Sequence, residues 1–230
     1  MKELLMQSAF FGVVISLLCF RLGLWVKKRT GFAIANPLLI AVVLIVGILL
    51  LFDIDYEIYE GGAKYISYFL TPATVSLAVP LYRQLELLKK YPKAIFGGIA
   101  AGVLTAMVSI FLMSLAFGLN HEQYVTLLPK SITTAIGMGV SEKMGGMVTI
   151  TVVAISITGI GGNIAAEAIC RIFKIQEPVA RGLAIGTASH AMGTARAMEL
   201  GKVEGAMSSL SIVVAGIMTV MSVSIFANFI

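Results

Sequence analysis

Long blocks of apolar residues alternate with short polar connections along almost the whole chain. The blocks cover about 4–26, 33–52, 64–82, 94–117, 125–142, 145–170, 182–200 and 206–229. Most of them approach the length of about 20 apolar residues that an α-helix needs to cross a bilayer. The pattern predicts an all-α membrane protein with about 6–8 transmembrane segments, forming one integral membrane domain over residues 1–230.

The composition supports this class. Hydrophobic residues make up 58% of the chain and charged residues only 13%, whereas soluble domains carry about 25% charged residues. The net charge of +5 does not indicate a nucleic-acid partner, because basic residues in such proteins hold loops on the cytoplasmic side. We therefore expect a multi-pass protein of the plasma (inner) membrane, surrounded by the lipid bilayer.

The charges of the loops predict how the chain is threaded. Four successive loops alternate in charge: basic residues at 27–29, acidic residues at 53–60, basic residues at 83–93, and no lysine or arginine at 118–124. Because basic loops stay cytoplasmic, this order places the N-terminus outside. The basic loop at 171–181 would then lie outside if segments 125–142 and 145–170 both crossed. Charge therefore favours a broken or re-entrant segment 125–142.

Two Gly-rich and Thr-rich segments resemble each other. TTAIGMGVSEKMGG begins at Thr133, and SHAMGTARAMELGK begins at Ser189. Each has a polar pair, a stretch of small residues with Gly137 or Gly193, and then an acidic residue. Because one full crossing separates them, we expect two broken segments that enter from opposite faces as an inverted repeat. Transporters often bind substrate between such discontinuous helices.

These segments could bind a small organic anion. Broken helices expose backbone N–H groups that favour a carboxylate, Arg196 could bind that carboxylate with two hydrogen bonds, and His190 could exchange a proton. The predicted substrate-binding residues are Asn36, Thr133, Thr134, Gly137, Thr187, Ser189, His190, Gly193, Thr194, Arg196 and Glu199.

Simpler alternatives stay open for several of these residues. Arg196 and Glu199 are three residues apart and could neutralise each other on one helix. His190 could be a hydrogen-bonded packing residue, and the threonine hydroxyls could bond to carbonyls of their own helix. Lys130, which follows Pro129 near a segment start, could extend its ammonium to the membrane interface.

Motifs of enzymes are missing from the sequence. It contains no G-x-S-x-G, no H-E-x-x-H and no phosphate-binding P-loop, and the two cysteines, Cys19 and Cys170, lie far apart with no metal-ligand spacing. Ser189 and His190 are a poor catalytic pair, because adjacent helical residues point in different directions. We expect a protein that is not an enzyme, with no catalytic residue, no metal site and no cofactor.

Four stretches carry a family resemblance. They are NPLL (36–39), PATVSLAVPLY (72–82), LPKSITTAI (128–136) and RGLAIGTASHAMGTARAMELGKVEGAMSSL (181–210). On these residues the chain resembles the LrgB family, also called CidB-like or antiholin-like membrane proteins, and the resemblance spans nearly all 230 residues. The family has no settled catalytic residues, so no residue role follows from it.

The resemblance implies two functions of different kinds. Members are often described as antiholin-like regulators of murein hydrolase activity and cell lysis that act with a small membrane partner of the LrgA/CidA type. Related proteins, including a plastid form fused to an LrgA-like half, are similar to carriers of glycolate, glycerate or pyruvate. We expect a carrier, or carrier subunit, for small monocarboxylates. The alternative is a regulatory subunit that modulates its LrgA/CidA-type partner without transport, and a homo-oligomer is compatible with both.

Overall fold

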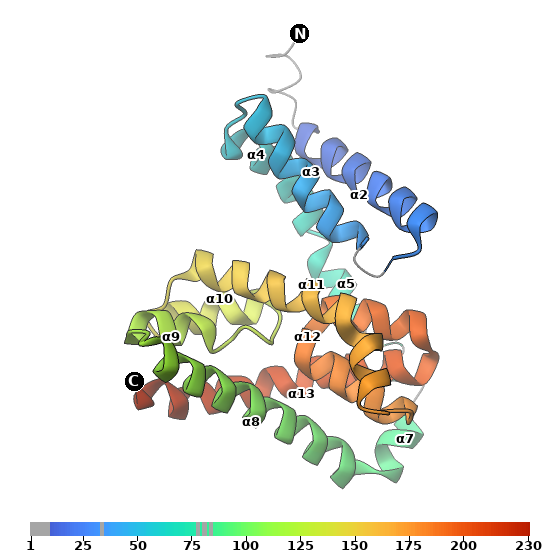
Figure 1. The fold of residues 1–230 in the computed structure, drawn as a ribbon, viewed down its shortest axis with the longest axis vertical. Helices are drawn as coiled ribbons and strands as arrows, with labels where there is room; N and C mark the ends of the chain where they lie inside the picture. The colour runs from blue at the N-terminus through green and yellow to red at the C-terminus, as the bar shows by residue number, and fades with distance from the viewer. Residues whose placement is uncertain (1–9, 33–34, 77–78, 80–81, 83–84) are drawn as a thin grey trace. The chain divides into compact units, whose positions relative to one another are not determined.

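The computed structural model describes residues 10–32, 35–76, 79, 82 and 85–230, and in these residues the chain forms helices and no β-strand (Figure 1). The predicted all-α class is therefore confirmed. The chain divides into two compact units, residues 1–76 and 77–230. The prediction of one integral membrane domain stays a prediction.

Within its described residues, the N-terminal unit has four helices. They are α2 (Phe11–Thr30), α3 (Pro37–Leu51), α4 (Tyr56–Ser67) and α5 (Leu70–Ser76). Asn36 precedes α3, and its side chain accepts hydrogen bonds from the N–H groups of Leu38 and Leu39, so it caps the helix in the usual way. The acidic stretch 53–60, expected as a loop, is a loop only up to Asp55, because α4 begins at Tyr56.

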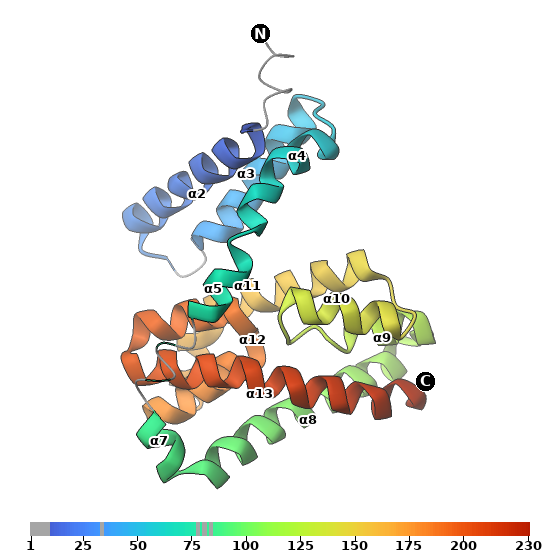
Figure 2. The same ribbon diagram turned by 180° about the vertical axis from the view of Figure 1, so that it is seen from behind.

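The C-terminal unit is built on three long helices. They are α8 (Pro92–Phe117), α11 (Val148–Ile172) and α13 (Lys202–Phe226), and each is long and apolar enough to cross a membrane. The shorter elements of this unit are α7 (Leu85–Lys90), α9 (His121–Leu127), α10 (Thr134–Lys143), α12 (Pro178–Leu200) and the 3₁₀ turn η1 (Ala227–Phe229). Figures 1 and 2 show α8 and α13 running in one direction and α11 in the other.

The two ends of this unit differ in charge. We call the end where α8 and α13 begin and α11 finishes the basic end. Its basic residues are Lys89, Lys90, Lys93, Arg171, Lys174, Arg181 and Lys202. At the opposite end, the far end, α8 passes into α9 and α10 passes into α11. By the rule that basic loops stay inside, the basic end is expected to face the cytoplasm.

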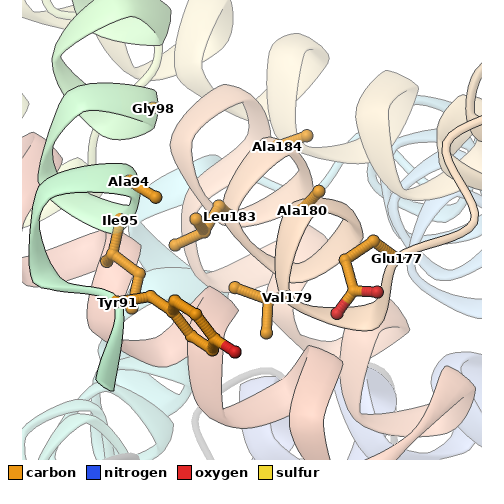
Figure 3. Close-up of a pocket in the computed structure, with 9 residues that line it drawn as sticks. All are labelled: Tyr91, Ala94, Ile95, Gly98, Glu177, Val179, Ala180, Leu183 and Ala184. Atoms are coloured by element: carbon orange, nitrogen blue, oxygen red, sulfur yellow. The ribbon is translucent and has the colours of Figure 1, made fainter. Parts of the chain in front are cut away.

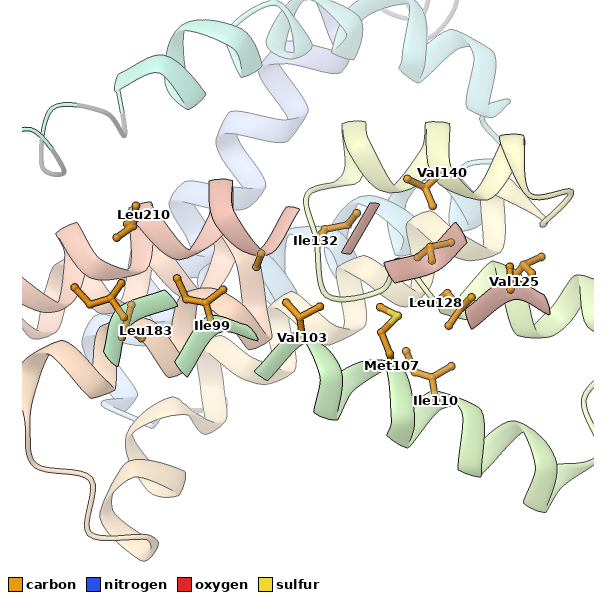
Figure 4. Packing of buried hydrophobic residues seen from close by; sticks show 14 of the residues in the cluster. Ile99, Val103, Met107, Ile110, Val125, Leu128, Ile132, Val140, Leu183 and Leu210 are labelled. Atoms are coloured by element: carbon orange, nitrogen blue, oxygen red, sulfur yellow. The ribbon is translucent and has the colours of Figure 1, made fainter. Parts of the chain in front are cut away.

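A hydrophobic core joins α8 and α13 to the shorter helices. Figure 4 shows Val103 and Met107 of α8 beside Leu128 and Ile132, which follow α9, and all four are buried. Helix α13 is enclosed most completely, since residues 204–212 are buried without interruption. Most of these nine residues are small, which lets neighbouring helix backbones come close.

Candidate functional site

Segment 125–142 forms a helical hairpin rather than one crossing helix. The first hairpin, residues 121–143, consists of α9, a non-helical turn at 128–133, and α10. Its turn folds back onto the start of α10, because a side-chain carbon on Gly137 would lie 3.5 Å from the carbonyl oxygen of Pro129. Its open end is tied to α11 at the far end, where Thr151 Oγ1 lies 2.7 Å from Ser141 Oγ and 2.8 Å from the carbonyl of Thr126.

Helix α12 is also a hairpin. The second hairpin, residues 178–200, is interrupted at His190, whose backbone angles are φ 43° and ψ −139°. In a continuous helix, Ile185 and Gly193 would be roughly 12 Å apart along the axis. In the structure they are in contact, since a side-chain carbon on Gly193 would lie 3.0 Å from the carbonyl oxygen of Ile185. The chain therefore reverses at His190. Ser208 of α13 contacts both arms, Thr194 through its hydroxyl at 2.7 Å and Gly186 through its backbone.

The tips of both hairpins reach the same residue of α11. Ile155 Cδ1 fills the space where a side chain on Gly137 would lie, on the return arm of the first hairpin. The carbonyl of the same Ile155 accepts a hydrogen bond from His190 Nε2, at 3.1 Å, at the tip of the second hairpin. Gly159, one turn further along α11, packs against the His190 ring. Both hairpins therefore end inside the unit, beside the middle part of α11.

The hairpins enter from opposite ends. The first opens at the far end, where α8 passes into α9 and α10 passes into α11. The second opens at the basic end, between the last turn of α11 and the first turn of α13. Loop 171–181 consequently lies at the same end as the start of α8, the arrangement that loop charge favours. The predicted pair of short, broken segments is confirmed, and their origin as an inverted repeat stays a prediction.

Five predicted site residues gather at the second tip. They are Thr187, Ser189, His190, Gly193 and Thr194, and all are buried. Thr194 Oγ1 donates to the carbonyl of His190 at 2.9 Å. The Thr187 hydroxyl differs from these, because it is buried, with the residue 7% exposed, and has no hydrogen-bond partner. An unsatisfied buried hydroxyl costs about 1–3 kcal/mol.

Arg196 and Glu199 lie nearer the basic end than the tip does. Arg196 follows the break by six residues, roughly 9 Å of helix. Its Nη2 is 2.9 Å from Glu167 Oε1 of α11, and its Nη1 donates to Glu199. Two carboxylates therefore surround this guanidinium, which matches the alternative in which Arg196 and Glu199 neutralise each other. The pair also ties the return arm of the hairpin to α11.

The other predicted residues occupy two places. Thr133 and Thr134 are half-buried where α10 begins, and the Thr133 side chain makes no capping hydrogen bond. Gly137 lies one turn further along α10, against Ile155. Asn36 belongs to the N-terminal unit, where its side chain caps α3. A role of these residues in binding stays a prediction.

The predicted substrate-binding residues do not include Lys130, which lies at the first tip. Its expected place was the membrane interface, but it lies in the turn between α9 and α10, and its Nζ is 3.3 Å from Oγ of the buried Ser131. No carboxylate of the described residues forms an ion pair with it. The available signal was its position in the broken segment, between a proline and the first threonines of α10.

A cavity of about 570 Å³ opens at the basic end (Figure 3). Its lining comes from the first turns of α8 and α12: Tyr91, Ala94, Ile95, Gly98, Glu177, Val179, Ala180, Leu183 and Ala184. The Tyr91 hydroxyl and the Glu177 carboxylate are the polar groups of this lining. None of the predicted site residues takes part. Thr187 lies one helical turn beyond Leu183, and the Cγ2 of Thr187 packs against Gly102 of α8.

The helices and the paired hairpins define a multi-pass, all-helical membrane protein. The LrgB-like family model matches residues 16–229. "Antiholin-like protein LrgB" of Bacillus cereus (strain B4264) and its namesake in Bacillus anthracis (strain A0248) are each 37% identical over 225 residues, 97% of this chain and 98% of theirs. No solved structure matches the chain. The chain belongs to the LrgB family and is a multi-pass protein of the cell membrane.

Proposed function

We propose that this protein carries small monocarboxylates, of the pyruvate, glycolate or glycerate class, across the cell membrane. The observation that supports the proposal most is the meeting of two opposed hairpins at Ile155. Backbone that is not helical is tolerated at membrane depth only where protein buries it or where it lines a polar cavity. Transporters use such breaks, near the middle of the bilayer, to bind substrate.

The proposed site lies between the two hairpin tips. The first tip contributes Thr133 and Thr134 at the start of α10, where N–H groups that are free of intrahelical bonds favour an anion. The second contributes the unpartnered Thr187 hydroxyl and the start of the return arm after His190. The cavity at the basic end reaches Leu183, one helical turn before Thr187, from the side expected to be cytoplasmic. Arg196 and Glu199 close the second hairpin below this site.

An antiholin-like regulatory role is the second candidate. The relatives named antiholin-like support it, and such a role implies a holin-like membrane partner of the LrgA/CidA type and an effect on murein hydrolase activity and cell lysis. In a carrier subunit, those effects would follow indirectly from altered metabolite flux. The two hairpins favour the carrier, because a subunit that only modulates a partner has no need for broken helices at membrane depth.

Uptake into proteoliposomes tests the proposal. The protein, alone and with an LrgA-type partner, is reconstituted under an imposed pH gradient and supplied with labelled pyruvate, glycolate or glycerate. Saturable uptake that unlabelled substrate suppresses is the expected result, with empty liposomes as the control. Uptake by neither preparation contradicts the carrier and leaves the regulatory role. An Arg196→Ala variant tests the base of the second hairpin, since lost uptake with intact insertion would show that transport requires its ion pairs.

A further inference from the structure

The charges inside the C-terminal unit are unevenly compensated. Arg196 is paired with two carboxylates, and Arg181 Nη1 lies 3.6 Å from Oε1 of the buried Glu204. Lys130, at the tip of the first hairpin, has no carboxylate partner among the described residues, and its ammonium donates a hydrogen bond to the neutral Ser131. An ammonium group has three N–H donors, so at least two remain for a ligand.

Lys130 lies at a depth where a cation without a partner is costly. Pro129, the residue before it, is level with Gly137 and hence with Ile155, about a third of the way along α11. The Nζ lies 3.3 Å from Oγ of Ser131, which is 7% exposed, and Lys130 itself is half-buried, so its ammonium is partly shielded from solvent at the tip. A cation at membrane depth is expensive and usually faces a cavity or an opposite charge. A carboxylate ligand would supply the opposite charge that the protein does not.

We propose that Lys130 is the residue that binds the substrate carboxylate and restricts the site to anions with one negative charge. The inference rests on the proposed function for the identity of the ligand class. One ammonium and one carboxylate form a neutral pair, whereas a second carboxylate would be buried without a cation, at a large cost in free energy. The three neighbouring polar residues, Ser131, Thr133 and Thr134, are uncharged and add hydrogen bonds without changing that balance.

Anion binding by the purified protein tests the inference separately from transport. The midpoint of thermal unfolding is measured in nanodiscs with sodium pyruvate, sodium succinate or sodium chloride at equal ionic strength. The variants are Lys130→Gln, which removes the charge, and Lys130→Arg, which keeps it. Lys143→Gln is the matched control, because Lys143 is the exposed lysine at the other end of α10.

Pyruvate is expected to raise the midpoint of the wild-type and Lys143→Gln proteins, and to do so more than succinate. Lys130→Gln is expected to weaken pyruvate binding at least tenfold, and Lys130→Arg to retain part of it. An unchanged pyruvate shift in Lys130→Gln overturns the inference even where uptake persists. A shift in the wild-type protein that depends on Lys130, without any uptake, upholds the inference and contradicts the carrier. No shift with either acid in the wild type overturns the inference.

A measurement on the wild-type protein keeps the inference testable if a Lys130 variant does not fold. A small acylating reagent modifies accessible lysines, and mass spectrometry measures the extent at Lys130 and at Lys143. Pyruvate is expected to protect Lys130 and to leave Lys143 unchanged. Equal modification of Lys130 with and without pyruvate overturns the inference.

Discussion

The two hairpins reverse the chain in different ways. The first uses two short helices and a turn of six residues, 128–133, and it carries an uncompensated lysine in that turn. The second reverses at the single residue His190, which is buried and hydrogen-bonded to α11, and its ion pairs lie toward the basic end. In the first hairpin, a lysine with no carboxylate partner among the described residues lies at the tip, whereas the ion pairs of the second hairpin lie at its base.

This difference suits the two hairpins to different tasks, ligand binding for the first and control of access for the second. Ion pairs of Arg196 with Glu167 and of Arg181 with Glu204 hold the base of the second hairpin to α11 and α13, at the end expected to face the cytoplasm. At the open end of the first hairpin, by contrast, the side-chain hydrogen bonds of the described residues to α11 involve the neutral groups of Thr126, Ser141 and Thr151. We expect the tip of the first hairpin to bind the ligand and the base of the second to regulate access.

The largest predicted effect concerns the side on which each hairpin opens. In a chain with Cys19 and Cys170 replaced by alanine, single cysteines are placed at Glu122 and Lys143, and in other variants at Gln176 and Lys202. A maleimide that does not cross the membrane should label the first pair from one side and the second pair from the other. Both members of a pair lie at one end because each hairpin returns to the end it entered.

The control is the same labelling after the membrane is permeabilised, when all four cysteines should react. If Glu122→Cys and Lys143→Cys reacted from opposite sides of the membrane, segment 125–142 would cross it. The comparison between two re-entrant hairpins would then fail.

The next largest effect is expected from substitutions that test how closely the second hairpin packs on α11. A side chain on Gly162 would overlap Ser189, whereas the position of a side chain on Gly161 is open. Gly162→Leu is expected to lower the free energy of unfolding by about 3 kcal/mol through overpacking. Gly161→Leu should stay close to the wild type in thermal unfolding. Similar effects of both substitutions would show that the tip does not contact this face of α11.

The break at His190 predicts an inverted order of two substitutions. Alanine is more favourable than glycine inside a helix by about 1 kcal/mol. At φ 43° the order should reverse, because glycine adopts this conformation without steric cost. His190→Gly and His190→Ala both lose the hydrogen bond to the Ile155 carbonyl, so we expect the glycine variant to be more stable by about 1 kcal/mol in denaturant unfolding. A more stable alanine variant would indicate a continuous helix.

The smallest effect belongs to the ion pair at the base of the second hairpin. The side chain of Glu167 is 41% exposed and that of Arg196 is 24% exposed, and exposed pairs contribute up to about 1 kcal/mol. A double-mutant cycle of Arg196→Gln and Glu167→Gln should give a coupling energy of about 0.5 kcal/mol. The coupling should decrease at high salt. A coupling of several kcal/mol would show that the pair is buried in the membrane-embedded protein.

The helical pattern and the presence of two irregular segments could be predicted from the sequence. Hydropathy blocks located α8, α11 and α13 to within a few residues, because a long apolar run has few alternatives to a helix in a membrane. The charge of loop 171–181 correctly favoured a segment that dips and returns. Glycine, proline and threonine marked the breaks, since these residues tolerate or cause an interruption of the helix.

The contacts at the tips could not be read from the sequence. The reversal at His190 depends on the approach of Ile185, Gly193 and Ser208, and no periodicity encodes where a chain folds back on itself. Lys130 illustrates the same limit. A lysine after a proline at the edge of an apolar block usually reaches water, and only the tertiary structure places its ammonium beside Ser131 in the turn of the first hairpin.

The uninterrupted burial of residues 204–212 in α13 also bears on how this protein tolerates change over evolution. A helix that exposes one face can accept substitutions every third or fourth position, but these nine positions have no permissive face. A library of all single substitutions should therefore show a continuous block of intolerance here, ending where Val213 becomes 55% exposed. Divergence among descendants of one ancestor should be slow in this block and faster along the second half of the same helix.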